Sequence, residues 1–97
     1  MKGLINTNIE KISDMMSTLS QKNRLQIVCF LSKHGEKCVC KICEELNIKQ
    51  NLASHHLNLL KNIWLIRARR DGKNIYYSID EVFYEELKGN IQCIFNF

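Results

Sequence analysis

Apolar side chains recur at the spacing of a helix face in five segments of the chain, and this pattern predicts a mainly α fold with about five helices. The apolar stripe of the first segment comprises Ile5, Ile9, Ile12, Met16 and Leu19. The stripe of the last segment, which we expect Asp80 to cap, comprises Phe83, Leu87, Ile91, Ile94 and Phe95. Because a small core does not need all of these side chains, we expect the two terminal helices to form a dimer interface.

The second segment, about residues 21–33, is expected to be the central core helix. It contains LQIVCFL, which is apolar nearly all round, as is typical of a helix that is buried on every side. Ser20 is expected to cap its start, and Gly35 suits its end because glycine often ends helices.

Two shorter helical segments, about residues 40–46 and 50–62, predict a helix-turn-helix. Asn47 is expected to end the first of them in a left-handed conformation. In the second, Ala53, Leu57 and Leu60 are expected to face inward, with His56 beside them as a packed core histidine. The outward face is then formed by Gln50, Asn51, Ser54, His55 and Asn58.

The runs LIRARR and NIYYSI are rich in residues that favour strands, and they flank the sequence Asp-Gly-Lys at residues 71–73. Asp-Gly between two such runs predicts a β-hairpin. The chain contains no proline, repeat or linker, so we interpret residues 1–97 as a single domain. The whole pattern predicts a winged helix-turn-helix with a two-stranded β-hairpin wing.

The predicted helix-turn-helix indicates binding to double-stranded DNA, because its second helix fits the major groove with its N-terminal residues toward the base edges. The hairpin tip would reach phosphates or the adjacent minor groove, and a lysine at the helix start would add a backbone contact. The predicted DNA-binding residues are Lys49, Gln50, Asn51, Ser54, His55, Arg70 and Lys73.

The charge distribution agrees with this interpretation. Residues 49–74 carry six basic and one acidic side chain, whereas residues 75–97 carry one basic and four acidic ones. A local excess of positive charge is typical of a surface that contacts phosphates, although a solvated charged face is the alternative. No apolar run is long enough to span a membrane, and the N-terminus lacks a secretory signal, so we expect a cytoplasmic protein with no membrane partner.

Three of the five cysteines, Cys38, Cys40 and Cys43, lie in EKCVCKIC with the spacing C-x-C-x-x-C. An odd number of crowded cysteines is poorly suited to a disulfide framework and favours reduced thiols that bind metal or react. At about 100° per residue, Cys40 and Cys43 share one face of a helix whereas Cys38 and Cys40 lie on opposite sides. All three can meet only if residues 38 and 39 leave helical geometry.

The sequence resembles the ArsR/SmtB family of metal- and metalloid-sensing winged-helix repressors. The resemblance covers roughly residues 20–80, and its most specific parts are SHHLNLL and RRDGKNIYYSI. It implies a homodimer that binds a DNA operator and is released by an inducer. Lys49 departs from the polar cap that is usual before the recognition helix, and this departure predicts a looser helix start.

The segment EKCVCKIC resembles ELCVCDLC, the arsenite- and antimonite-binding element of arsenic-responsive family members. This resemblance implies arsenite or antimonite as the inducer ligand, bound by Cys38, Cys40 and Cys43, and no obligatory cofactor. Trivalent arsenic is soft and takes three thiolates, whereas zinc requires a fourth ligand.

A second resemblance concerns Cys29 and Cys93, because oxidant- and sulfide-responsive family members place paired cysteines on the corresponding helices. A redox or reactive-sulfur sensor is therefore the alternative function, and packing of both thiols is the plainer interpretation. The family's zinc site in the last helix is not expected, because its anchoring histidines are missing.

An enzyme is not expected, because the sequence has no glycine-rich phosphate loop and no nucleophile elbow. A reductase that uses C-x-C or C-x-x-C is the best enzymatic alternative, but such motifs usually follow a strand in a βαβ unit. A winged helix that docks another protein is a further alternative, although QNLASHH lacks the aromatic anchors of such surfaces.

Overall fold

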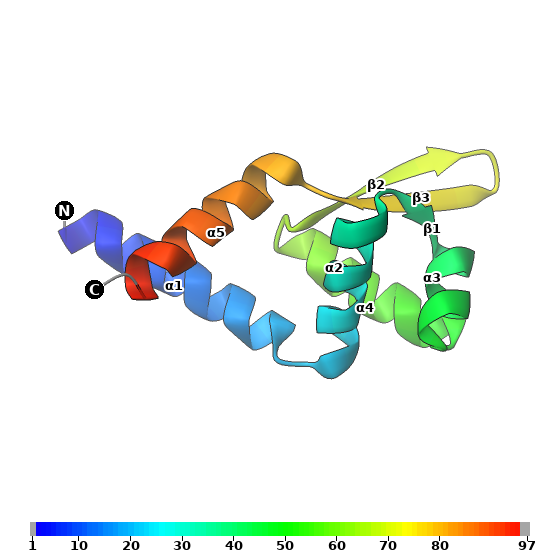
Figure 1. Ribbon diagram of the computed structural model, residues 1–97, viewed down its shortest axis with the longest axis horizontal. Helices are drawn as coiled ribbons and strands as arrows, with labels where there is room; N and C mark the ends of the chain where they lie inside the picture. The colour runs from blue at the N-terminus through cyan, green and yellow to red at the C-terminus, as the bar shows by residue number, and fades with distance from the viewer. Residues whose placement is uncertain (1, 96–97) are drawn as a thin grey trace.

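The computed structural model describes the backbone of residues 2–95 and the side chains of residues 9–89, 91 and 92. Its elements are α1 (Lys2–Leu19), α2 (Lys22–His34), β1 (Lys37–Cys38), α3 (Val39–Leu46), α4 (Gln50–Asn62), β2 (Ile66–Asp71), β3 (Asn74–Ile79) and α5 (Glu81–Phe95). Figure 1 shows α1 and α5 side by side at one end of the molecule, and the hairpin of β2 and β3 at the other. Over residues 2–95, the predicted mainly α winged-helix fold with five helices is confirmed.

The sheet differs from the prediction in having three strands. Its order is β1-β3-β2, with both pairings antiparallel, and the predicted hairpin turns at Gly72, whose φ is 64°. The predicted two-stranded wing was therefore incomplete, because the sheet also contains β1. This strand contributes only Lys37 and Cys38, which is too short to produce a recognisable alternation of apolar and polar residues.

The core lies where α2, α3 and α4 meet one another and the sheet. Its largest fully buried side chains are Ile27, Leu31, Ile42, Leu57, Leu60 and Leu65. The expectation that α2 is buried on every side was wrong, because Leu25 is 46% exposed and Cys29 is also exposed. Helix α2 is instead amphipathic and turns one face to the core.

Two of the predicted helix caps can be compared with the structure. Asp80 Oδ1 accepts a hydrogen bond from the Phe83 backbone N–H at 3.1 Å, which confirms the cap of α5. The expected cap of α2 was wrong, because Ser20 Oγ donates to the carbonyl oxygen of Ser17 at 2.7 Å. Gln21 holds the N-cap position instead, and in the described chain its side chain makes no capping hydrogen bond.

The terminal helices expose several apolar side chains. Ile12 and Met15 of α1 are buried, whereas Ile9 and Met16 are 51% and 42% exposed. Met16 of the predicted stripe is thus exposed, and its neighbour Met15 faces the core. In α5, Leu87 is buried and Phe83 and Ile91 are partly buried. Ile5, Ile94 and Phe95 lie outside the described side chains.

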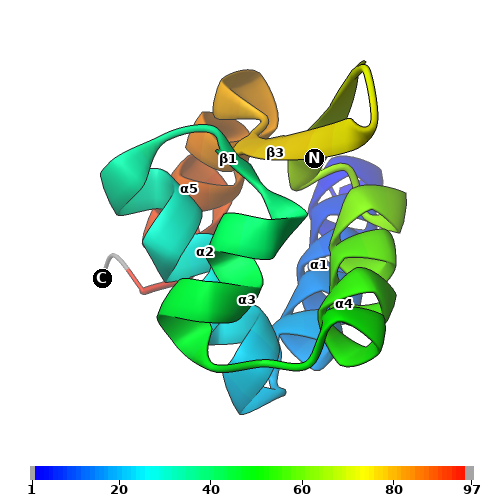
Figure 2. The same ribbon diagram turned by 90° about the vertical axis from the view of Figure 1, so that its right-hand side faces the viewer.

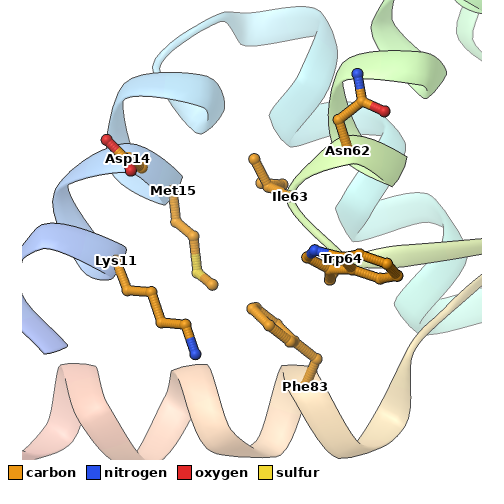
Figure 3. Close-up of a pocket in the computed structure, with 7 residues that line it drawn as sticks. All are labelled: Lys11, Asp14, Met15, Asn62, Ile63, Trp64 and Phe83. Carbon is orange, nitrogen blue, oxygen red and sulfur yellow. The ribbon is translucent and has the colours of Figure 1, made fainter. Parts of the chain in front are cut away.

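Trp64 occupies an unusual position two residues after the end of α4. Its φ is 67°, a left-handed conformation that is costly for a bulky residue, and its side chain is 71% exposed. Figure 3 shows it at the edge of a hollow lined by Met15, Ile63, Phe83 and the aliphatic part of Lys11. Among the described residues, no helix is both long enough and apolar enough to cross a membrane.

Candidate nucleic-acid interface and thiol site

The outward face of α4 carries the residues predicted to read DNA. Gln50, Asn51 and His55 are exposed, and Ser54 is partly exposed. Lys49 occupies the N-cap position, and within the described chain its side chain makes no capping hydrogen bond. The start of α4 is therefore held by its backbone and by Asn51, whose Oδ1 accepts a hydrogen bond from the Leu52 N–H at 2.9 Å.

The inner face of α4 fixes how this outward face is presented. Ala53, Leu57 and Leu60 are fully buried, as predicted from their spacing. His56 is also buried, which confirms its expected place in the core, and its Nδ1 accepts a hydrogen bond from Arg24 Nε at 3.1 Å. Burial, followed by the charges of Arg24 and His55, lowers the pKa of His56. The recognition helix is thus attached to α2 through a neutral histidine.

Sequence reasoning missed Arg24, which also donates from Nη1 to the carbonyl oxygen of Thr18 at 3.0 Å. One side chain therefore joins the end of α1 to the inner face of α4. Arg24 and His56 are 32 positions apart. Neither periodicity nor spacing along the chain indicates such a tertiary contact.

The wing carries exposed basic side chains. Arg70 and Lys73 lie at or beside the hairpin turn, as predicted, and both are exposed. Figure 1 places the hairpin tip and the start of α4 at the end of the molecule that lies opposite the chain termini. The predicted base-reading and phosphate-contacting residues therefore belong to the same end of the fold.

Arg69 is the wing arginine that forms ion pairs with described residues. Its Nη2 and Nε donate to the two carboxylate oxygens of Glu36, at 2.7 Å and 3.1 Å. Its guanidinium also lies over the ring of Tyr76, 4.9 Å from the ring centre. The hydrogen bond to Arg69 lowers the pKa of Glu36 and raises the pKa of Arg69. Sequence reasoning missed Glu36, which lies 33 positions before Arg69.

The three clustered cysteines lie at the junction of β1 and α3. Cys38 has extended backbone, with φ −73° and ψ 160°, and stands just outside the helix as expected, whereas Val39 is already its first residue. Cys38 and Cys40 are joined in a disulfide, with their Cα atoms 5.4 Å apart, which differs from the reduced thiols that the sequence favoured. Figure 2 shows this junction, with β1 beside β3 and α3 beside α4.

Cys43 lies one turn further along α3, partly buried against the core. Burial raises the pKa of its thiol, and the contribution of the local backbone hydrogen bond is smaller and opposite. Among the side chains that the structure describes, no three His, Cys, Asp or Glu groups are arranged to hold a metal ion. Two of the predicted sulfur ligands are thus bonded to each other, and the third is a free thiol.

The alternative redox pair is only partly described. Cys29 is exposed on α2, so the expectation that its thiol packs in the core was wrong. The side chain of Cys93 lies outside the described residues. A switch that uses both thiols therefore stays a prediction.

Known proteins share both this sequence pattern and this fold. The family model described as "Bacterial regulatory protein, arsR family" matches residues 21–67. An uncharacterized HTH-type transcriptional regulator of Methanocaldococcus jannaschii is 39% identical over 80 residues, which span 81% of this chain and 90% of that protein. The chain belongs to the ArsR family. It is a transcriptional regulator of that family with a DNA-binding winged-helix fold.

Other ArsR-family relatives carry names that refer to different soft ions. A homolog of the cadmium resistance regulatory protein CadC from Staphylococcus aureus is 36% identical, with 89% of this chain and 71% of that protein covered. The arsenical resistance operon repressor of Escherichia coli is 38% identical over 65 residues, which cover 67% of this chain and 56% of that protein.

A solution structure of a homodimeric winged helix-turn-helix domain from Mycobacterium bovis aligns with a TM-score of 0.71. Its sequence is 28% identical, and the alignment covers 96% of this chain and 82% of that one. The relatives and the fold thus agree on a transcriptional regulator.

Proposed function

We propose that the protein is a homodimeric repressor that leaves its DNA operator when trivalent arsenic or antimony binds Cys38, Cys40 and Cys43. The observation that carries this proposal is the position of Cys38. It ends β1, which pairs with wing strand β3, and it directly precedes α3, which packs against recognition helix α4. A ligand at this cysteine therefore acts where both DNA-contacting elements are attached.

The donor set fits a thiophilic ion. Three thiolates satisfy trivalent arsenic or antimony, and the chain provides three sulfurs within six positions. Binding requires the Cys38–Cys40 disulfide to be reduced, which supplies two thiols next to each other at the start of α3. The Cys43 thiol then has to turn from the edge of the core toward them, and it must lose its proton.

Release from DNA is explained by where the three cysteines lie relative to α3. Cys40 and Cys43 are three positions apart in α3, whereas Cys38 lies in β1 before the helix begins. A ligand that draws Cys38 toward Cys43 displaces β1 or unwinds the first turn of α3. If DNA binds the undistorted form better, ligand and operator oppose each other by a coupling free energy of about 1–3 kcal/mol.

The proposed homodimer is supported by the exposed apolar side chains of the terminal helices. Ile9 and Met16 on α1 and Val82 on α5 are exposed, and a second copy would bury such a surface. The structural relative from Mycobacterium bovis is itself a homodimer. Two copies of α4 would then read a two-fold symmetric operator, which is the usual arrangement for helix-turn-helix dimers.

The decisive experiment is a titration of the reduced protein with arsenite. A dye-labelled duplex, selected from a random pool with the reduced protein, reports binding through its anisotropy. We expect arsenite to release the parent protein from DNA, and Cys38→Ser, Cys40→Ser and Cys43→Ser to remain bound. Cys29→Ser is the matched control, because Cys29 is an exposed thiol on α2 and does not belong to the proposed ligand set.

Two outcomes of this titration would contradict the proposal. Arsenite-driven release that survives replacement of any of the three cysteines would remove that cysteine from the ligand set. Release by cadmium with no response to arsenite would overturn the assignment of arsenic while leaving the protein a repressor that senses a soft metal.

A further inference from the structure

Three side chains form a row across the sheet from the thiol site to the wing. Cys38 of β1 lies opposite Tyr76 of β3, and Tyr76 in turn lies opposite Arg69 of β2. Opposite residues of antiparallel strands project from the same face of a sheet. Cys38, Tyr76 and Arg69 therefore share one face, with Tyr76 in the middle.

At the wing end of this row, Arg69 makes direct contacts with two other side chains. The guanidinium of Arg69 lies 4.9 Å from the centre of the Tyr76 ring and is held by both carboxylate oxygens of Glu36. Glu36 stands two positions before Cys38, in the segment that leads into β1. A two-pronged arginine–carboxylate pair fixes orientation as well as distance. The segment that carries Cys38 is thus attached to the wing at a second point.

The Glu36–Arg69 pair matters because β1 is short. Only Lys37 and Cys38 pair with β3, opposite Tyr77 and Tyr76. A strand of two residues that is pulled by a ligand at its last position would slide along β3 and leave the wing in place. With Glu36 bound to Arg69, the wing must follow the displaced segment or lose the pair.

We propose that Glu36 and Arg69 are positioning residues that transmit ligand binding at Cys38 to the wing. This inference rests on the proposed function, since it assumes that a ligand at Cys38 weakens operator binding. It adds a second path to the one that runs from α3 to α4. Through this path the wing moves away from its DNA contact when Cys38 is drawn toward Cys43.

The test compares Glu36→Gln, Arg69→Gln, the double variant and Arg69→Lys. The measured quantity is the ratio of operator affinities of the reduced protein without and with saturating arsenite. We expect each single variant to reduce this ratio by about two- to five-fold, because the exposed pair forms only one of two paths and exposed ion pairs contribute little free energy. The double variant should lose no more than the single ones, because both changes remove the same interaction.

Glu45→Gln is the matched control. Glu45 lies on α3 near the same cysteines, is exposed, and pairs with Lys41 at 3.4 Å, so its replacement changes the charge equally without touching the sheet. We expect it to keep the parent ratio. The absorbance of the arsenic–sulfur bonds checks that every variant binds arsenite with the parent stoichiometry, and thermal unfolding checks that each is folded.

Arg69→Lys tests whether the response to arsenite depends on the geometry of the guanidinium or only on its positive charge. Lysine keeps the positive charge but lacks the planar fork, so we expect it to lose the response as Arg69→Gln does. A parent-like ratio in Arg69→Lys or Glu36→Gln, with the parent released normally by arsenite, would overturn this inference alone. If the parent itself stays bound to DNA under arsenite, the proposed function falls, and the inference falls with it.

Discussion

Arg24 Nε and His56 Nδ1 lie 3.1 Å apart in a hydrogen bond that the arginine donates, so the buried imidazole accepts and is neutral at that nitrogen. Protonation of His56 would replace this hydrogen bond with repulsion between two cations. The contact joins α2 to the inner face of the recognition helix. The position of the side chains that are predicted to read DNA thus depends on a contact that protonation of one histidine would break.

The first prediction concerns the pH dependence of stability. The pKa of His56 is lowered in the folded protein, whereas a histidine in the unfolded chain titrates near about 6.5. As the pH falls below about 6.5, the unfolded state therefore takes up a proton that the folded state resists. We expect the stabilisation that His56 contributes to be fully present above about pH 6.5. It should be lost as the pH falls through the lowered pKa of His56 in the folded protein.

Urea unfolding at about pH 7.5 and about pH 5.5 measures this effect. His56→Gln should flatten the pH dependence, because the glutamine carbonyl accepts from Arg24 and does not titrate. Asn58→Ala is the control, since Asn58 is exposed on the same helix and carries no ionisable group. Equal loss of stability on acidification in the parent and in His56→Gln would contradict the assignment.

The second prediction compares two leucines of the recognition helix. Leu57 is fully buried, whereas Leu52 is 42% exposed. We expect Leu57→Ala to lower the free energy of unfolding by about 2–5 kcal/mol, because it leaves a cavity in the core. Leu52→Ala should cost less than about 1 kcal/mol. Similar losses for the two variants in urea unfolding would show that α4 does not pack as described.

The third prediction concerns the wing and salt. Lys73 is exposed at the hairpin turn, where we expect it to contact a DNA phosphate. Lys73→Ala should weaken binding to all duplexes by a similar factor and reduce the slope of log affinity against log salt by about 1. Lys88→Ala is the control, because Lys88 is exposed on α5 and pairs with Glu85 at 3.2 Å. An unchanged salt slope in Lys73→Ala would place the DNA elsewhere.

The fourth prediction concerns oxidation of the thiol site. When diamide oxidises Cys38 and Cys40, each thiol loses a proton and an electron to the diamide, which becomes a hydrazine, and one S–S bond forms. Of the three proposed ligands only Cys43 is then a thiol, so we expect the oxidised protein not to respond to arsenite. Reduction with dithiothreitol should restore the response.

The control for oxidation is Cys29→Ser treated in the same way, because it removes the exposed thiol on α2 as a competing target. A loss of about 2 Da from a peptide that contains residues 38 and 40 identifies the bond. Normal arsenite binding by the fully oxidised protein would show that the disulfide and the ligand do not share these sulfurs.

Local patterns in the sequence predicted much of this fold. The spacing of Ala53, Leu57 and Leu60 located α4 and its buried face. Asp71-Gly72 located the hairpin, and Asn47 ends α3 with φ 54° as expected. Each of these features depends on neighbours within a few positions, which is the range over which sequence patterns are informative.

Features that depend on tertiary pairing were not predicted. β1 is a strand only because β3 lies beside it, and Glu36 meets Arg69 only after the sheet has formed. Met15 and Met16 are equally apolar neighbours, so composition does not indicate which of them faces the core. Likewise, the apolar neighbours of Cys29 suggested burial, but the helix turns this side chain outward. Spacing alone likewise did not indicate that Cys38 and Cys40 are joined in a disulfide.

Trp64 gives the chain a natural optical reporter, since it is the only tryptophan in the sequence. Its indole stands largely in water beside α1 and α5, so its emission should lie toward long wavelengths. Any event that covers this ring moves the emission toward the blue without a dye or an added label. The left-handed backbone at this position thus presents to the solvent a single chromophore that registers changes around the terminal helices.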